Sequence, residues 1–292
     1  MKGNSKEIDM LHGPLLKKIL VFALPLALSS MMQQLFNSID VAVVGHFASR
    51  EALAAVGSNG PVINLLINLF IGVSMGATVV ISNHIGQRDD SRTKRAISTA
   101  AFVAVTSGIF LMFLGFLAAR PILELIDTPD DVLDLAELYL RIYFCGMPFL
   151  MVFNFAAAIL RSIGDTKRPL YILIVAGVVN ALLNLLLVVV FHMSVAGVAI
   201  ATCIANAISA TLIVRILIRE AEPYRLDVKG IRVEWQELKR MLQIGVPAGI
   251  QGMIFSFSNV LMQSAISSLS VRSVVGESIE ESLSNVPSRS ET

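Results

Sequence analysis

The sequence predicts an all-α protein, a polytopic transmembrane helical bundle with one six-helix lobe and the first helix of a second lobe. Three observations support this. Hydrophobic residues make up 55% of the chain and charged residues only 15%, whereas soluble domains are about 25% charged. The mean hydropathy is +0.72, and long apolar runs recur along the chain. Backbone groups in lipid must be satisfied within their own segment, so these runs are expected to be helices.

Seven apolar segments are each long enough to cross about 30 Å of hydrocarbon as a helix. They cover residues 19–39, 61–83, 97–118, 139–160, 169–191, 196–218 and 241–266. Pro25, Pro148 and Pro247 lie within three of them, and proline can kink a helix because it lacks a backbone N–H. The residues before the first segment lack the small-residue cleavage pattern of a signal peptide.

Lysine and arginine residues are concentrated in every second connection between the predicted spans. Eighteen of them fall in the N-terminal arm and in the connections 2–3, 4–5 and 6–7. The opposite loops hold only Arg50, Arg120 and Arg141. Because basic loops stay in the cytoplasm, we expect a multi-pass protein of the cell membrane with a cytoplasmic N-terminus. Its formal net charge of +1 predicts no nucleic acid partner.

A weak internal repeat suggests a domain boundary. Laying Pro247 over Pro25 also superposes the basic pair at 239–240 on the pair at 17–18. An even number of spans separates the copies, so they would be parallel repeats. After residue 269 the chain is rich in Ser and Glu and is typical of disorder. The predicted division is a six-helix lobe at 1–218, a cytoplasmic linker at 219–238, the first helix of an incomplete second lobe at 239–269 and a disordered tail at 270–292.

Asp40 is the main candidate for a functional residue. A carboxylate near the middle of a span costs about 2.5–3.5 kcal/mol on insertion scales and indicates a functional site. Gln33 and Asn37 share its helical face. Polar side chains in other spans are predicted to line one cavity facing it, although any single amide could instead serve helix packing. These residues are Asn64, Asn68, Asn154, Asn180, Asn184, Thr202 and Asn206.

The chemistry expected of Asp40 is ion coupling. A lone carboxylate can bind and release a proton as water access changes, or it can coordinate Na⁺ with amide oxygens; the sequence leaves both open. No cofactor or metal site is expected, because Cys145 and Cys203 lie in apolar runs without metal-ligand spacing. Residues 72–76 match the G-x-S-x-G pattern, but a membrane span offers no strand-to-helix elbow. Small residues for helix packing explain the match better, so no enzyme is predicted.

Residues 160–169, LRSIGDTKRP, resemble the R-x-x-G-D-T-K-x-P-like loop of the multidrug and toxic compound extrusion (MATE) transporters. Pro25 followed by Asp40 in the first helix, and Asn180 with Asn184 in the fifth, agree with this resemblance, which covers about residues 14–268. It implies a cation-coupled (H⁺ or Na⁺) multidrug efflux antiporter. Asp40 would be the coupling carboxylate, and cationic or aromatic drugs would be the substrates. The residues implied around it are Gln33, Asn154, Asn180, Asn184 and Thr202.

Two features depart from that family. Archaeal-type members carry a second acid where this chain has Asn184, and the family has twelve helices in two lobes. We therefore expect a chain truncated after helix 7, with the C-terminal lobe as its missing partner, that is inactive alone. One alternative is a lipid-linked oligosaccharide flippase-like relative, which should carry basic residues in its cavity. The sequence indicates none inside helices 1–6. The other is a non-transporting membrane fragment.

Overall fold

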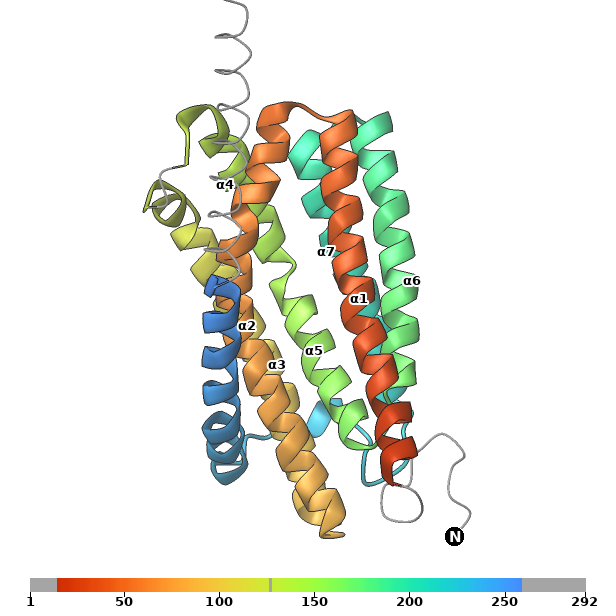
Figure 1. Cartoon of the computed structure of the whole chain (residues 1–292). Helices are drawn as coiled ribbons and strands as arrows, with labels where there is room; N and C mark the ends of the chain where they lie inside the picture. The colour runs from red at the N-terminus through yellow and green to blue at the C-terminus, as the bar shows by residue number, and fades with distance from the viewer. Residues whose placement is uncertain (1–14, 126–127, 259–292) are drawn as a thin grey trace, which may run out of the picture.

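The computed structural model describes residues 15–125 and 128–258 as an all-α bundle, and no strand occurs within these ranges. This confirms the predicted fold class. Most of the helices run roughly parallel to one axis (Figure 1). The elements are α1 (Leu15–Phe47), α2 (Arg50–Gly86), α3 (Asp90–Leu125), α4 (Asp130–Cys145), α5 (Met147–Ser162), α6 (Lys167–Asn184), the π-helix η1 (Leu185–Val190), α7 (Ser194–Ile218), the 3-10 turn η2 (Val228–Gly230) and an unlabelled helix at residues 235–258.

Five described helices are long and apolar enough to cross a membrane, namely α1, α2, α3, α6 with η1, and α7. The predicted span 139–160 is broken, because α4 and α5 meet at Gly146 with a bend of 46°. Pro148 lies in the first turn of α5, where its missing N–H is tolerated. Together α4 and α5 are long and apolar enough to count as a sixth span. The described part of the predicted seventh span is helical but is not among these six, and residues 259–266 lie outside the described residues.

The buried core consists of two clusters placed one after the other along the bundle. The first joins the C-terminal end of α1 and the first half of α2 to α4 and the start of α7, and it includes Leu140 and Phe144. The second joins the later half of α2 and the start of α3 to α5 and the end of α7, and it includes Phe155 and Leu160. This packing holds α1, α5, α6 and α7 around a polar region described below.

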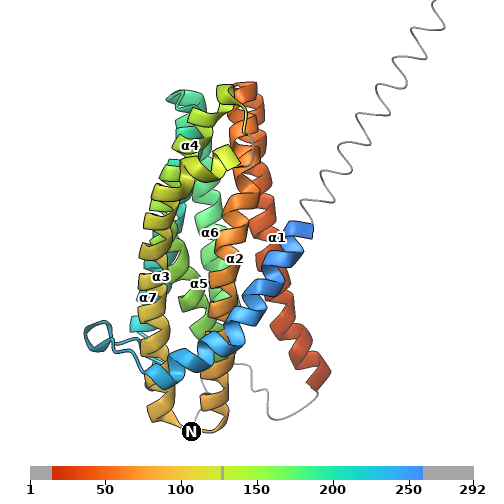
Figure 2. The ribbon, with the colours of Figure 1, turned by 90° about the vertical axis from the view of Figure 1, so that its left-hand side faces the viewer.

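The helix at 235–258 packs across α2 through glycines (Figure 2). A Cβ on Gly72 would overlap the backbone of Gly249, and a Cβ on Gly76 would overlap the carbonyl of Met241. Gly245 meets the backbone of α2 in the same way. The two helices therefore touch backbone to backbone, as small residues permit in membranes. The prediction that the glycines of residues 72–76 serve helix packing is confirmed.

The connections α2–α3, α5–α6 and α7–η2, which carry the basic residues counted above, gather at one end of the bundle (Figure 1). At the other end, two of the three arginines pair with one buried carboxylate. Arg120 lies 3.1 Å and Arg141 2.5 Å from Glu137. The alternation read from the sequence is thus present in space, and the assignment of the basic end to the cytoplasm stays a prediction.

The connection between α7 and the last helix is attached to α3. Ser98 Oγ accepts a hydrogen bond from the Arg232 N–H at 2.7 Å, and the Glu234 N–H donates to Thr99 Oγ1 at 3.1 Å. The following helix begins at residue 235, four residues before the predicted boundary at 239. The division into two lobes stays a prediction, and the predicted tail at 270–292 lies outside the described residues.

Candidate functional site

A chain of polar side chains connects α1, α6 and α7 around Asp40. Asn184 Nδ2 donates to Asp40 Oδ1 at 2.5 Å and to Asn180 Oδ1 at 3.2 Å. Asn180 Nδ2 donates to Thr202 Oγ1 at 3.3 Å. Asn180 and Asn184 lie one turn apart on α6, so their side chains stack on one face. Both asparagines are buried, and the network therefore holds the Asp40 carboxylate in place from the buried side.

The backbone around Asn184 departs from the regular α-helix. Asn184 is the last residue of α6, and the six residues of η1 continue the span as a π-helix. A π-helical turn leaves a wider spacing between backbone groups and is frequently found at functional sites. The carboxylate of Asp40 contacts Asn184 where the α-helix α6 changes to the π-helix η1. The site therefore lies at an irregular part of this span.

Asp40 faces a cavity of about 200 Å³ between α1, α2, α4, α5, α6 and α7. Polar residues named from the sequence lie on its wall, although their part in binding stays a prediction. The wall also carries aromatic rings that the sequence argument missed, those of Phe36, Tyr143 and Phe153. Phe36 is one turn from Asp40, and this spacing was the available signal. The predicted wall residues are Gln33, Asn37, Asn64, Asn154, Asn180, Thr202 and Asn206.

Two predicted cavity residues lie elsewhere. Asn184 does not line the cavity, because it is fully buried behind Asp40 and supports it. Asn68 is not among the residues that line the cavity, and its Nδ2 donates to Ser256 Oγ on the last helix at 2.8 Å. For Asn68 the cavity prediction is therefore wrong, and the alternative role in helix packing holds. The i, i+4 spacing of Asn64 and Asn68 placed both on one face, but the last helix covers only Asn68's end of it.

A second pocket of about 260 Å³ adjoins the first, with which it shares Gln33, Phe153 and Asn154. Arg161 lines it. The guanidinium turns back along α5, with Nε donating to the Ala157 carbonyl at 3.1 Å. The expectation that helices 1–6 hold no internal basic residue is therefore wrong. Arg161 lies in the last turn of α5, and the sequence argument counted it with the loop.

The loop motif after α5 has a structural explanation. Gly164 has φ of 90°, a left-handed conformation that favours glycine. Buried Asp165 accepts hydrogen bonds from the backbone N–H groups of Lys167 at 3.2 Å and Arg168 at 3.1 Å, and it also pairs with the Arg168 side chain. These bonds satisfy free N–H groups at the start of α6. The motif therefore fixes where α6 begins. This in turn sets the position of Asn180 and Asn184 along the bundle, beside Asp40.

One side of the cavity is open. Gln33, Asn37 and Asn64 are exposed on α1 and α2, although they line the cavity. An unsatisfied amide facing hydrocarbon costs several kcal/mol. The face between α1 and α2 therefore suits water or protein better than lipid.

Comparisons with known proteins agree on one family. The family model MatE matches residues 25–186. The chain is 29% identical over 266 residues to the probable multidrug resistance protein YpnP of Bacillus subtilis (strain 168). The aligned region covers 90% of this chain and 59% of that protein. It is 30% identical over 253 residues to the probable multidrug resistance protein YoeA of the same strain. That aligned region covers 84% of this chain and 55% of that protein.

Solved structures show the same fold. A structure described as MATE in the bent conformation superposes with a TM-score of 0.82 at 22% identity, covering 89% of this chain and 58% of that chain. An outward-facing MATE family transporter of the MOP superfamily superposes with a TM-score of 0.81, covering 90% of this chain and 58% of that chain. The chain thus spans somewhat more than half the length of the proteins that it matches.

Proposed function

Because the chain belongs to the MatE family of membrane transporters, we propose that it carries the ion-coupling lobe of a multidrug efflux antiporter driven by H⁺ or Na⁺. The protein would lie in the cell membrane with its N-terminus in the cytoplasm, the end at which the basic connections gather. Small cationic or aromatic drugs would enter the cavity beside Asp40.

The observation that carries this proposal is the carboxylate of Asp40 on the cavity wall. Within the described residues its hydrogen-bond partner is the neutral amide of Asn184, and no arginine or lysine pairs with it. A carboxylate without a cationic partner in a partly dry cavity attracts a proton, a metal cation or a drug cation. Since one site holds one of these at a time, exchange of an ion for a drug follows from competition.

The aromatic rings of Phe36, Tyr143 and Phe153 suit the substrate class. Flat apolar cations bind aromatic faces through cation–π attraction and stacking, worth about 0.5–2 kcal/mol for each contact. The amides around the cavity accept and donate hydrogen bonds without fixing one ligand shape. This mixture of one charge, several rings and several amides supports recognition of many drugs rather than one.

Direct binding tests the proposal. The 292-residue chain, purified in lipid nanodiscs, is titrated with the fluorescent cation ethidium, and its anisotropy is followed at acidic and neutral pH with and without NaCl. We expect acid to weaken binding and Asp40→Asn to remove both binding and its pH dependence. Weakening by NaCl at neutral pH indicates Na⁺ coupling, whereas weakening by acid alone indicates H⁺.

Asp131→Asn is the matched control, because Asp131 is exposed in the first turn of α4 and does not line the cavity. This variant should bind ethidium like the unchanged chain. Full binding by the Asp40→Asn variant would overturn the proposal and leave the alternative of a membrane protein without transport activity.

Binding and transport are separate expectations. Alternating access in this kind of transporter rocks one lobe against another, and the chain spans about 55–59% of the length of the relatives YpnP and YoeA. We therefore expect these 292 residues alone to bind drug without completing transport. Expression in a host without efflux pumps should give no drug resistance; resistance that disappears with Asp40→Asn would contradict this.

Arg161 favours a second candidate, export of an anionic compound by a lipid-linked oligosaccharide flippase-like relative. Its guanidinium lines the pocket that adjoins the cavity, and a positive charge there attracts an anion and repels a cation. Arg161→Gln distinguishes the two. Multidrug cation binding should strengthen roughly three- to five-fold, whereas anion binding should weaken. Arg225→Gln, an exposed position at the same end of the bundle, is the control.

A further inference from the structure

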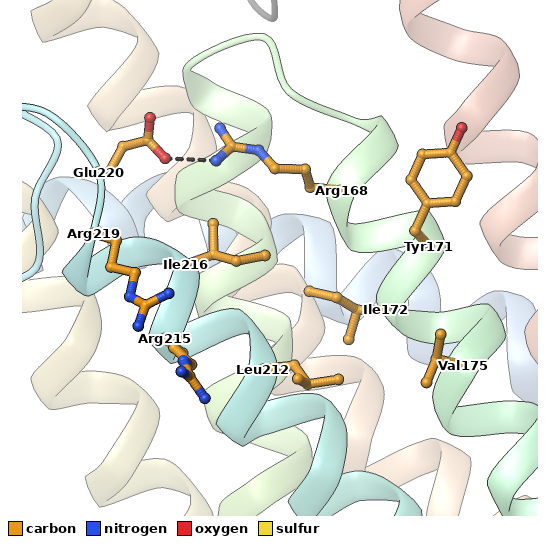
Figure 3. A pocket seen from close by; sticks show the side chains of 9 residues that line it. All are labelled: Arg168, Tyr171, Ile172, Val175, Leu212, Arg215, Ile216, Arg219 and Glu220. Carbon is orange, nitrogen blue, oxygen red and sulfur yellow. Dashed lines mark hydrogen bonds and ion pairs between the residues drawn. The ribbon is translucent and has the colours of Figure 1, made fainter.

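A groove separate from the cavity lies between α6 and α7 at the basic end of the bundle (Figure 3). Its volume is about 530 Å³. α6 contributes Tyr171 and Val175 along its length, and α7 contributes Arg215 and Arg219 from its last turn and end. The other lining residues are Arg168, Ile172, Leu212, Ile216 and Glu220.

Two positive charges at the rim of the groove are not neutralised. Arg215 and Arg219 lie one turn apart on the same face of α7, both are exposed, and neither makes an ion pair with a described residue. Arg168, which also lines the groove, differs from them because it is held by Glu220 at 2.6 Å and by Asp165. The groove therefore presents two free guanidinium groups beside one that is already neutralised.

Below the rim the groove is apolar. Leu212 lies about one turn deeper than Arg215 along α7, and Val175 lies one turn deeper than Tyr171 along α6. Tyr171 is 63% exposed and Val175 is 50% exposed, so this wall is open to the surroundings of the bundle. Tyrosine near a helix end, with apolar residues beyond it, is typical of a membrane interface.

We propose that this groove binds an acidic glycerophospholipid, such as phosphatidylglycerol. The lipid phosphate pairs with Arg215 and Arg219, and an acyl chain lies along Val175 and Leu212. Anionic headgroups attract basic residues at the membrane surface, and basic pockets between transmembrane helices bind such headgroups. Guanidinium groups suit phosphate because they donate two parallel hydrogen bonds.

The position of the groove favours lipid over another part of the protein. The helix at 235–258 carries the chain across α2, whereas the groove lies between α6 and α7 on the other side of the bundle (Figure 1). The groove shares no lining residue with the cavity of Asp40, so lipid binding here does not depend on the proposed transport function.

Native mass spectrometry of the delipidated chain in neutral detergent tests the proposal. The chain is titrated with dioleoylphosphatidylglycerol and, separately, with dioleoylphosphatidylcholine. We expect one tightly bound phosphatidylglycerol and much weaker binding of phosphatidylcholine. The double variant R215Q/R219Q should bind phosphatidylglycerol roughly 25-fold more weakly, the product of about five-fold for each basic side chain.

The double variant K239Q/R240Q is the matched control, because it removes two exposed charges from the same end of the bundle but outside the groove. It should bind phosphatidylglycerol like the unchanged chain. Val175→Trp, which fills the apolar wall without changing the charge, should also weaken binding. Three results would overturn the proposal: equal binding of phosphatidylcholine, equal losses in the two double variants, or displacement of the lipid by inorganic phosphate, which would indicate a simple phosphate site.

Discussion

Asn184 Nδ2 lies 2.5 Å from Asp40 Oδ1, so a buried amide of α6 holds the carboxylate of α1 at the cavity wall. The same amide donates to Asn180 Oδ1 at 3.2 Å, which uses both of its N–H groups. The first bond joins α1 to α6, and the second lies within α6. Asn184 is therefore a positioning residue, and its loss should affect folding as well as the cavity.

Asn184→Leu is expected to destabilise the chain by about 1–3 kcal/mol, because Asp40 and Asn180 each lose a hydrogen-bond donor in a buried setting. Thermal unfolding in detergent, followed by circular dichroism, measures the effect. Asn206→Leu is the matched control, since Asn206 lines the cavity and its side chain makes no hydrogen bond with a described residue. Equal losses in the two variants would show that the Asp40–Asn184 bond adds no stability.

A buried hydrogen bond between His84 and Glu237 connects the last helix to α2. His84 Nε2 lies 2.8 Å from Glu237 Oε2, and the two side chains are only 2% and 5% exposed. Removing one partner of a buried hydrogen bond costs about 1–3 kcal/mol, and more for a charged group, because the other partner is left unsatisfied, whereas replacing both partners with apolar residues is often nearly neutral. We expect His84→Leu and Glu237→Leu to lower stability strongly and the double variant to recover most of the loss.

Denaturant unfolding of the two single variants and the double variant measures this coupling. Lys94→Ala provides the comparison, because Lys94 pairs with Glu222 at 2.7 Å on an exposed surface, where an ion pair contributes only about 0–1 kcal/mol. Additive losses from the His84 and Glu237 variants would contradict the coupling.

The sequence alone predicted the features that follow from placing the chain in a membrane. Apolar length defined α2, α3 and α7, and the cost of a charge in lipid identified Asp40. The i, i+4 spacing of Asn180 and Asn184 placed both on the face of α6 that meets the carboxylate. The helices and the contact between Asp40 and Asn184 were predictable because a membrane restricts the backbone to helices and penalises isolated polar groups, whereas the coupling role of Asp40 stays a prediction.

Features that depend on contacts between distant segments were not predictable in the same way. Asn68 differs from Asn64 only because residue 256 comes close to it. Arg161 enters a pocket because its side chain folds back along α5, a choice of rotamer that spacing does not encode. The pairing of His84 with Glu237 joins positions 153 residues apart. A single sequence offers no pattern that links such positions.

The glycine contact between α2 and the last helix should be sensitive to any side chain. Gly72→Val would drive a branched side chain into the backbone of Gly249, and overpacking of this kind typically costs about 1–3 kcal/mol. Gly57→Val in the same helix is the control, because a Cβ there has no neighbour within 4 Å. Thermal unfolding should separate the two variants, and equal stability would contradict close packing at Gly72.

Gly177 sets the spacing between α1 and α6 at the cavity, because a Cβ there would overlap the ring of Phe36. Asp40 is one turn beyond Phe36 on α1, so Gly177→Val should push α1 outward and separate Asp40 from Asn184. We expect ethidium binding to weaken about ten-fold, which corresponds to ~1.4 kcal/mol, well within the usual cost of overpacking. Phe36→Ala added to Gly177→Val makes room for the new side chain and should recover the position of Asp40, detected as a return of the pH dependence of binding, at an affinity lowered by the loss of the Phe36 ring. Full ethidium affinity in Gly177→Val alone would show that the α1–α6 contact does not position the carboxylate.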